Sequence, residues 1–304
     1  MRAPFLSKAF LRLGPAQRRR ILHRLGRFGP WEPGFDFTPP PLPPGHVAGA
    51  PDFVGIGAQK AATTWWFDLI STHPGVSAPG HLSKERHLLD RFAGQAFDAA
   101  TREQYPQWFP RRPGTLAGEW TPDYVTFAWA PELLHRVAPD ARLLMLVRDP
   151  IERFRSGLDH YRALQQPVDG MVLADAVARG FYARAIAPWR EVFGPDRLLV
   201  LQYEQCVSDT AGQLARTFDH LGLTTYHVSP NEVPPRQRPV AHAPLDPDAI
   251  ERLVALYRSD VEALRGLVPH LDMRLWPHFD RPDRHPGGGS GSSVAADSSP
   301  TVRP

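Results

Sequence analysis

The sequence FVGIGAQKAATTWWFDLISTHP at residues 53–74 decides the fold of this chain. Its first residues are apolar or glycine, which is typical of a strand buried on both faces. A loop of small residues follows, and from Thr63 onward Trp65, Leu69 and Thr72 are spaced along a helix. A strand, a tight loop and a helix N-terminus in this order predict an anion-binding site, because free amides and the helix dipole both favour negative charge there.

The loop carries donors that suit a phosphate: backbone amides, two hydroxyl groups and one ammonium group. In an ordinary nucleotide P-loop the Lys directly precedes the hydroxyl residue that holds magnesium. Here Lys60 precedes Thr63 by three positions, and no glycine lies between them. As an alternative, the small residues only allow the helix to pack close to the strand. The candidate ligands are Gln59, Lys60, Ala61, Ala62, Thr63 and Thr64.

A second motif, ARLLMLVRDPIERFRSGLDHYR, begins at residue 141. Its apolar run predicts a buried strand that ends at Arg148, after which Asp149 and Pro150 open a helix as N-cap and first residue. Arg148 is therefore expected at the carboxyl end of a strand, where open α/β sheets bind ligands. An arginine fork there and the hydroxyl of Ser156 suit a terminal phosphate. The alternative is a capped helix with a salt-bridging arginine.

Between these motifs, SKERHLLD at residues 83–90 places the ionisable side chains of Lys84, Glu85, His87 and Asp90 close together. A carboxylate can accept the proton of an attacking hydroxyl if partial burial raises its pKa towards neutrality. We therefore expect Glu85 to be a general base, with His87 as the rival base. A solvated charged turn is the alternative for the whole segment.

Apolar runs of strand length alternate with helical patterns, which predicts an α/β domain with a largely parallel sheet flanked by helices. The expected strands cover residues 52–58, 115–120, 142–148 and 197–203, and helical patterns follow residues 63, 131, 150, 171, 208 and 246. We expect a basic N-terminal helix and a Pro/Gly-rich linker over residues 1–50, the domain over 51–280 and a disordered tail over 281–304.

Composition narrows the function classes. The chain has 304 residues, of which 42% are hydrophobic, and a net charge of +3 that is too small to argue for nucleic acid. It has no apolar run near the roughly 20 residues of a membrane span, and its lone cysteine, Cys206, fits a reducing compartment. We expect a cytoplasmic protein, with residues 1–28 either packed on the domain or touching an anionic membrane.

The two anion motifs resemble those of PAPS-dependent sulfotransferases, where PAPS is 3′-phosphoadenosine 5′-phosphosulfate. GxxKxxTT resembles the family's 5′-phosphosulfate loop, although the family usually has Gly where this chain has Ala62. The signature R-[DN]-P-x-x-R-x-x-S, which binds the 3′-phosphate in the family, falls on Arg148, Asp149, Pro150, Arg153 and Ser156. The resemblance implies a P-loop-like sulfotransferase fold and PAPS as the sulfuryl donor, with no metal.

The resemblance is greatest to the carbohydrate branch, which includes heparan sulfate sulfotransferases, and to related bacterial enzymes. In that branch a KExHFFD segment supplies the base from its Glu, which implies this role for Glu85. GEWTPDY resembles an element near the acceptor cleft, where Trp120 replaces a Lys and favours a neutral or apolar acceptor. Arg179 and Tyr182 match an RGxY helix. A basic loop over the nucleotide is expected to contribute Arg236 and Arg238.

We therefore predict a sulfotransferase that moves a sulfuryl group from PAPS to a hydroxyl or amine of a glycan, glycolipid or small molecule. Lys60 would stabilise the leaving group, while Arg148 and Ser156 would hold the 3′-phosphate. Two alternatives stay open. One is a P-loop kinase, and the other is a non-catalytic, membrane-associated protein that binds nucleotides or lipid headgroups.

Overall fold

The computed structural model describes residues 17, 21, 24, 35, 37–77, 82–163, 167–229 and 244–280. Most of the predicted N-terminal helix, the predicted nucleotide-closing residues Arg236 and Arg238, and the predicted tail at 281–304 lie outside the described residues. The domain boundaries at residues 51 and 280 therefore stay predictions.

A four-stranded sheet forms the centre of the fold, and its strands follow the order β2-β1-β3-β4. β1 pairs in parallel with β2 and β3, and β3 pairs in parallel with β4, so all four carboxyl ends meet at one edge. The predicted parallel α/β class is confirmed. The strands are β1 (Phe53–Gly57), β2 (Gly118–Trp120), β3 (Arg142–Val147) and β4 (Leu198–Gln202).

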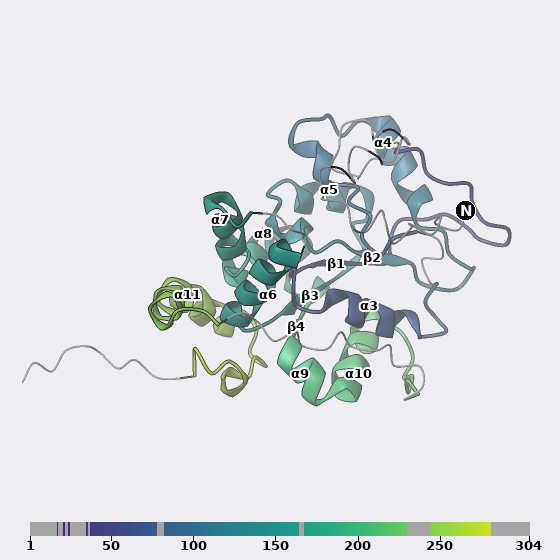
Figure 1. Ribbon diagram of the computed structural model, residues 1–304. Coiled ribbons are helices and arrows are strands. Elements are labelled where there is room, and N and C mark those ends of the chain that lie inside the picture. The colour runs from purple at the N-terminus through teal and green to yellow at the C-terminus, as the bar shows by residue number, and fades with distance from the viewer. Residues whose placement is uncertain are drawn as a thin grey trace, which may run out of the picture.

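Helices cover both faces of the sheet (Figure 1). α3, α9 and α10 lie below it in that view, α5 and α8 lie above it, and α6 contacts both α7 and α11. The α-helices are α3 (Thr63–Ser71), α4 (Ala99–Gln104), α5 (Ala130–Val137), α6 (Pro150–Ala163), α7 (Gly170–Ala178), α8 (Tyr182–Phe193), α9 (Tyr203–Ser208), α10 (Thr210–Leu221) and α11 (Pro247–Leu267). Short 3₁₀ turns are η1 (Asp90–Ala93), η2 (Tyr105–Trp108), η3 (Tyr124–Thr126), η4 (Pro195–Arg197) and η5 (Met273–Leu275).

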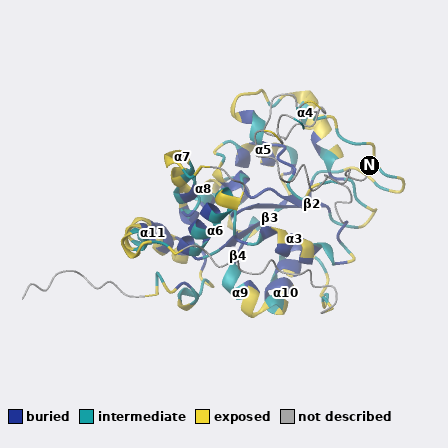
Figure 2. Ribbon diagram, in the orientation of Figure 1, coloured by how far each residue is buried: buried dark blue, intermediate teal, exposed yellow. Residues whose placement is uncertain are grey.

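β1 and β2 approach each other closely where Trp120 lies against Gly55. Every residue of β1 is buried, as the dark blue sheet in Figure 2 shows. A Cβ atom on Gly55 would lie 1.9 Å from Cδ2 of Trp120, so glycine is needed for this close approach. Trp120 is completely buried and its indole nitrogen donates to the Gly57 carbonyl at 3.0 Å. Our prediction that Trp120 presents an aromatic face to the acceptor is therefore wrong.

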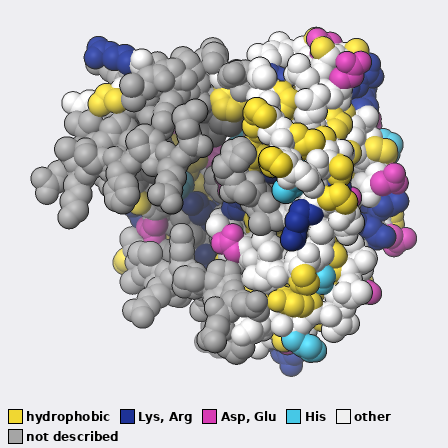
Figure 3. Space-filling model, turned by 90° about the vertical axis from the view of Figure 1, so that its right-hand side faces the viewer, with side chains coloured by type: hydrophobic (Ala, Val, Ile, Leu, Met, Phe, Trp, Pro, Cys, Tyr) yellow, Lys and Arg dark blue, Asp and Glu magenta, His cyan; other side chains and the backbone are white. Residues whose placement is uncertain are grey.

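The described surface is mixed in charge. On the face shown in Figure 3, basic side chains are interspersed with acidic and uncharged ones. Among the residues that the structure describes, no helix combines the length and apolar character that crossing a membrane requires.

Candidate active site

The loop between β1 and α3 forms an open anion cradle. α3 has no side-chain cap at its N-terminus, and its first backbone bond runs from the Trp66 amide to the Ala62 carbonyl at 3.2 Å. Within the described part of the chain, the amides of Thr63, Thr64 and Trp65 donate to no protein acceptor. Since buried helix ends normally find partners for these groups, the loop is suited to an anionic ligand.

The backbone of this region adopts conformations that non-glycine residues avoid. Lys60 and Ala62 have φ values of 67° and 65°, and His87 has a φ of 54°. These three are the non-glycine residues with positive φ among the described residues. Each left-handed residue costs about 1–2 kcal/mol, and such strain concentrates at functional sites. The positive φ at Ala62 is a conformation that favours glycine, the residue that the family usually has there, and the positive-φ residues coincide with both predicted chemical segments.

The predicted loop residues differ in their exposure. Lys60, Gln59 and Ala62 are half-buried, Ala61 and Thr63 are buried, and Thr64 is exposed. In the described part of the chain the Lys60 ammonium group makes no hydrogen bond or ion pair. Burial lowers the pKa of Lys60, and the negative charges of Glu85 and Asp123 offset this effect only in part. Lys60 thus faces the site as a cation available for a ligand.

Arg148 joins the second anion motif to the first. It follows β3, and its Nη1 donates to the Lys60 carbonyl at 3.4 Å. The Tyr182 hydroxyl donates to the Arg148 carbonyl at 2.8 Å, and the ring of Tyr203 lies 5.1 Å from the guanidinium carbon. Tyr182 therefore supports the backbone at Arg148. Ser156 is half-buried on α6, two turns into the helix.

Arg153, which belongs to the same motif as Arg148 and Ser156, lies in the interior of the protein. Its side chain is completely buried and donates to the Ala176 carbonyl in α7. The guanidinium group therefore fixes α6 against α7 and does not face the anion loops.

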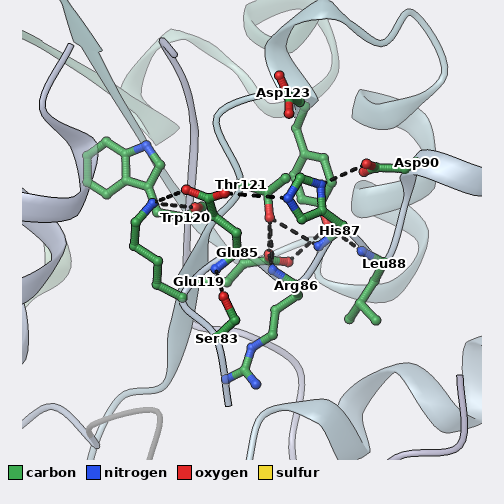
Figure 4. Close-up of polar contacts among 12 residues, drawn as sticks. Ser83, Glu85, Arg86, His87, Leu88, Asp90, Glu119, Trp120, Thr121 and Asp123 are labelled. Atoms are coloured by element: carbon green, nitrogen blue, oxygen red, sulfur yellow. Dashed lines mark hydrogen bonds and ion pairs between the residues drawn. The ribbon is translucent and has the colours of Figure 1, made fainter. Parts of the chain in front are cut away.

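Residues 83–90, called the base segment here, place charged side chains in a continuous row (Figure 4). Nζ of Lys84 lies 2.5 Å from Oε1 of Glu85, and Nε2 of His87 lies 3.5 Å from Oε2 of the same carboxylate. Nδ1 of His87 lies 2.7 Å from Oδ2 of Asp90. A cation therefore stands on each side of Glu85, and His87 lies between two carboxylates.

This row changes the ionisation that we predicted for Glu85. Burial raises its pKa, but the contact with His87 and the charge of Lys84 together outweigh burial and lower the pKa to about 2. The expectation of a pKa near neutrality is therefore wrong for the ligand-free protein. Burial lowers the pKa of His87, but the bonds to Asp90 and Glu85 raise it to about 10.

The buried end of β2 and the turn after it hold the base segment in place. The Glu119 carboxylate, which is completely buried, accepts from the Arg86 amide at 3.1 Å and from the Thr121 hydroxyl at 2.6 Å. The Thr121 hydroxyl oxygen in turn accepts from the His87 amide at 3.2 Å, and the Tyr124 hydroxyl oxygen accepts from the Leu88 amide at 2.8 Å. GEWTPDY thus fixes the loop that carries Glu85.

Two further groups near the reacting centre, His160 and Asp123, were not predicted from the sequence. His160 lies one turn beyond Ser156 on α6, and burial together with the charge of Lys60 lowers its pKa. Asp123 pairs with Arg179, whose Nε also lies 2.7 Å from Oδ2 of Asp175. The four-residue spacing from Ser156 was a usable signal for His160, whereas the Asp123 pair joins residues 56 positions apart.

Comparison with known proteins shows which proteins this chain resembles. Residues 86–227 match the model described as the sulfotransferase family. The chain is 31% identical over 189 residues to heparan sulfate glucosamine 3-O-sulfotransferase 6 of Homo sapiens, which covers 57% of this chain and 52% of that protein. It is 35% identical over 107 residues to omega-hydroxy-beta-dihydromenaquinone-9 sulfotransferase of Mycobacterium bovis, which covers 32% of this chain and 27% of that protein. The chain spans about half the length of the first of these relatives.

A solved structure supports the fold. The sulfotransferase from Alicyclobacillus acidocaldarius matches with a TM-score of 0.57 at 20% identity, covering 75% of this chain and 98% of that one. The predicted resemblance and the predicted fold are confirmed. The matches favour a sulfotransferase over the kinase and the non-catalytic binding protein.

Proposed function

We propose that this chain, a homologue of sulfotransferases, transfers a sulfuryl group from PAPS to an acceptor hydroxyl. The observation that carries the proposal is the contact between Arg148 and the Lys60 carbonyl, because it brings two anion-binding motifs together at the carboxyl edge of the sheet. Glu85 influences the pKa of Lys60, so a proton acceptor lies beside the same loop.

The residues present fit PAPS. Unpartnered amides at the start of α3 and the free ammonium group of Lys60 suit the 5′-phosphosulfate, and the guanidinium of Arg148 suits the 3′-phosphate. When bound, PAPS supplies an activated sulfuryl group. Lys60 would then stabilise charge that develops at the leaving oxygen, and the strained loop would hold its donors in place.

Glu85 is the better candidate for the base than His87. Both ring nitrogens of His87 contact carboxylates, and the pKa of about 10 keeps the imidazole protonated, so it cannot accept a proton at neutral pH. Glu85 is ionised and partly exposed, so its carboxylate can accept a proton, although a pKa of about 2 makes it a weaker base than a carboxylate whose pKa lies near neutrality. His87 and Asp90 would orient its carboxylate and keep it ionised.

The acceptor would be uncharged beside its reacting hydroxyl. Arg179 lies near the site but is already paired with Asp123 and Asp175, so this cation is not available to an anionic acceptor. The negative charge of Asp123 also acts on Lys60 and His87, which disfavours further negative charge nearby. The name of the human relative quoted above specifies an oxygen at 31% identity, whereas a relative named as an N-sulfotransferase is 24% identical, which favours a hydroxyl over an amine.

Calorimetric titration with 3′-phosphoadenosine 5′-phosphate (PAP) and with ATP tests the proposed donor. We expect PAP to bind far more tightly than ATP, since only PAP carries the 3′-phosphate for Arg148. Preference for ATP would support a kinase. Binding of PAP without any sulfated product, in extracts incubated with PAPS and analysed by mass spectrometry, would support a non-catalytic role.

A matched pair of test acceptors addresses acceptor charge. We expect PAP release with phenyl β-D-glucoside to exceed that with phenyl β-D-glucuronide, which differs by one carboxylate. The Asp123→Asn variant should reduce this preference, because it releases part of the positive charge of Arg179. A preference for the glucuronide in the wild-type protein would contradict the proposal.

The cytoplasmic location and a membrane contact of residues 1–28 stay predictions.

A further inference from the structure

The segment formed by residues 270–279, called the C-terminal clip here, is fastened along the edge strand β4. Nε2 of His270 lies 2.9 Å from the Val200 carbonyl. The Gln202 side chain forms two bonds with the backbone of Asp272, both at 2.9 Å. Among the residues that the structure describes, β4 pairs with β3 alone, so the clip covers an edge that would otherwise expose backbone groups.

Beyond this anchor, two side chains of the clip reach the turn that carries Arg148. Trp276 is completely buried, and its indole nitrogen donates to Oε2 of Glu204 at 2.9 Å. Oε1 of Glu204 accepts from the Asp149 amide at 3.0 Å. Nδ1 of His278 lies 3.0 Å from Oδ2 of Asp149. The clip thus holds the Asp149 amide indirectly, through Trp276 and Glu204, and holds the Asp149 carboxylate directly, through His278.

Asp149 transmits this contact to the nucleotide motif. Its other oxygen, Oδ1, accepts from the Ile151 amide at 2.8 Å, so one carboxylate both caps α6 and binds His278. The side chain of Asp149 is 2% exposed, which leaves it no water to replace a lost partner. The buried carboxylate of Asp149 therefore connects His278 to the turn that carries Arg148, the adjacent residue.

We propose that His278 is a positioning residue for the nucleotide donor and that its cationic form holds the turn of Arg148 in the binding conformation. This inference rests on the proposed function and adds a pH-dependent control of donor affinity. His278 makes no described contact with the anion loop itself, so it acts through Asp149.

The charges around His278 support a protonated ring. The hydrogen bond to Asp149 is the largest influence and raises its pKa, burial opposes this rise, and Glu152 strengthens it. Arg155 acts in the opposite direction, and Glu204 lies on the other side of Asp149. Bound phosphate adds negative charge near this cluster, so the pKa of His278 should be higher in the complex. By linkage, donor affinity is then greatest below the pKa of His278 in the free protein, and it falls as pH rises from that value through the higher pKa of His278 in the complex.

Two variants separate charge from packing. His278→Asn keeps a donor near the Nδ1 position but cannot titrate, whereas His278→Ala removes the donor. PAP affinity is measured by calorimetry at about pH 7 and about pH 9.5, where the phosphate, with a second pKa of about 6, is fully ionised. His135→Asn, at an exposed site on α5, is the matched control.

We expect the wild-type and His135→Asn affinities to fall by about 3- to 10-fold more over this range than the affinity of His278→Asn. Burial lowers the pKa of Lys60 in all three proteins, so any loss from Lys60 at the higher pH cancels in this comparison. His278→Ala should bind weakly at both pH values, and His278→Asn should recover most of the affinity at the lower pH. Equal pH dependence in wild type and His278→Asn, or wild-type affinity in His278→Ala, would overturn the proposal.

A readout without nucleotide separates failure of this inference from failure of the proposed function. NMR titration of the His278 ring in the ligand-free protein should show a pKa above the ordinary value of about 6.5, and Asp149→Asn should lower it. Absence of PAP binding to folded wild-type protein would refute the donor. An unshifted His278 pKa that Asp149→Asn does not change would refute the clip contact independently.

Discussion

The His87 imidazole and the Glu85 carboxylate lie 3.5 Å apart, from Nε2 to Oε2, and each stabilises the charged form of the other. Asp90 completes the row on the far side of His87. The proton acceptor of the proposed reaction is therefore held ionised by a neighbour that remains protonated.

Replacement of Glu85 by Gln should affect the reaction and spare the donor. The amide keeps the size of the side chain but accepts no proton at neutral pH, so the turnover number should fall by about 10² to 10⁴ while PAP affinity stays close to wild type. Steady-state kinetics and calorimetry measure the two effects. Loss of turnover in His87→Ala alone, with Glu85→Gln active, would instead assign the base to the imidazole.

The ion pair also predicts a pH dependence. The depressed pKa of Glu85 means that its ionised form contributes stability above pH 4.5, which is lost as pH falls towards about 2. The raised pKa of His87 means that its contribution is complete below pH 6.5 and is lost as pH rises through about 10. Between pH 4.5 and pH 6.5 both contributions are complete, so the free energy of unfolding, measured by urea denaturation, should vary little with pH through this pair. In His87→Asn, the loss of stability at acidic pH should begin at a higher pH, because burial raises the pKa of Glu85 and the contact with His87 that lowers it is gone. An unchanged dependence at acidic pH would argue against this coupling.

Lysine at position 60 should not be replaceable by arginine. Of the 35 Lys and Arg residues only Lys8, Lys60 and Lys84 are lysines, and Lys60 lies in a loop with left-handed backbone at two positions. A planar fork cannot occupy the place of a compact ammonium in this loop. Both Lys60→Arg and Lys60→Ala should lower turnover by about 10² to 10³ without a change in the thermal unfolding midpoint. Near wild-type turnover in Lys60→Arg would show that any cation suffices.

Arg148→Ala should weaken PAPS binding by roughly 2 to 4 kcal/mol, since the 3′-phosphate would lose a charged partner. Adenosine 5′-phosphosulfate lacks this phosphate and should lose far less affinity. Arg162→Ala is the matched control, because Arg162 also lies on α6 and pairs with Asp159 at 2.9 Å. Calorimetry with both nucleotides measures the difference, and equal losses would remove Arg148 from this role.

Gly55→Ala tests the packing that places β1. The new methyl group would overlap the Trp120 ring, so we expect a loss of unfolding free energy of at least about 3 kcal/mol. Gly94→Ala is the control, because a Cβ atom there meets nothing within 4 Å. Urea denaturation of both variants provides the comparison, and similar midpoints would contradict the close approach.

Local sequence patterns predicted the strands because each apolar run fills one buried strand, and β1, β3 and β4 lie within the expected ranges. The helix after β4 was placed too late, since α9 begins at Tyr203, where we expected the strand to end. α4 was missed: none of its residues is buried, so it has no apolar periodicity, and its signal was the Asp98 cap that accepts from Thr101.

The predicted site residues could be placed by motif, but their ionisation could not. The pKa of Glu85 depends on how the chain turns at His87, where φ is positive, and on the Thr121 hydroxyl that holds the His87 amide. Thr121 is 34 positions away in the sequence. Burial of Trp120 likewise depends on a glycine in another strand, so a residue matched to an acceptor element became part of the core.

Because β1 and β3 are neighbouring strands, the sheet fixes the distance between the backbone positions of Lys60 and Arg148. Lys60 follows one of these strands and Arg148 follows the other, and neighbouring strands stay about 4.8 Å apart because their backbone hydrogen bonds fix the spacing. The separation between the two cations is thus set mainly by backbone register and much less by side-chain choice. A nucleotide with its second phosphate moved to the 2′ position would carry the same charge at the wrong span. Engineering a different donor into this scaffold would accordingly require a shifted strand, since exchanging the cations leaves the span unchanged.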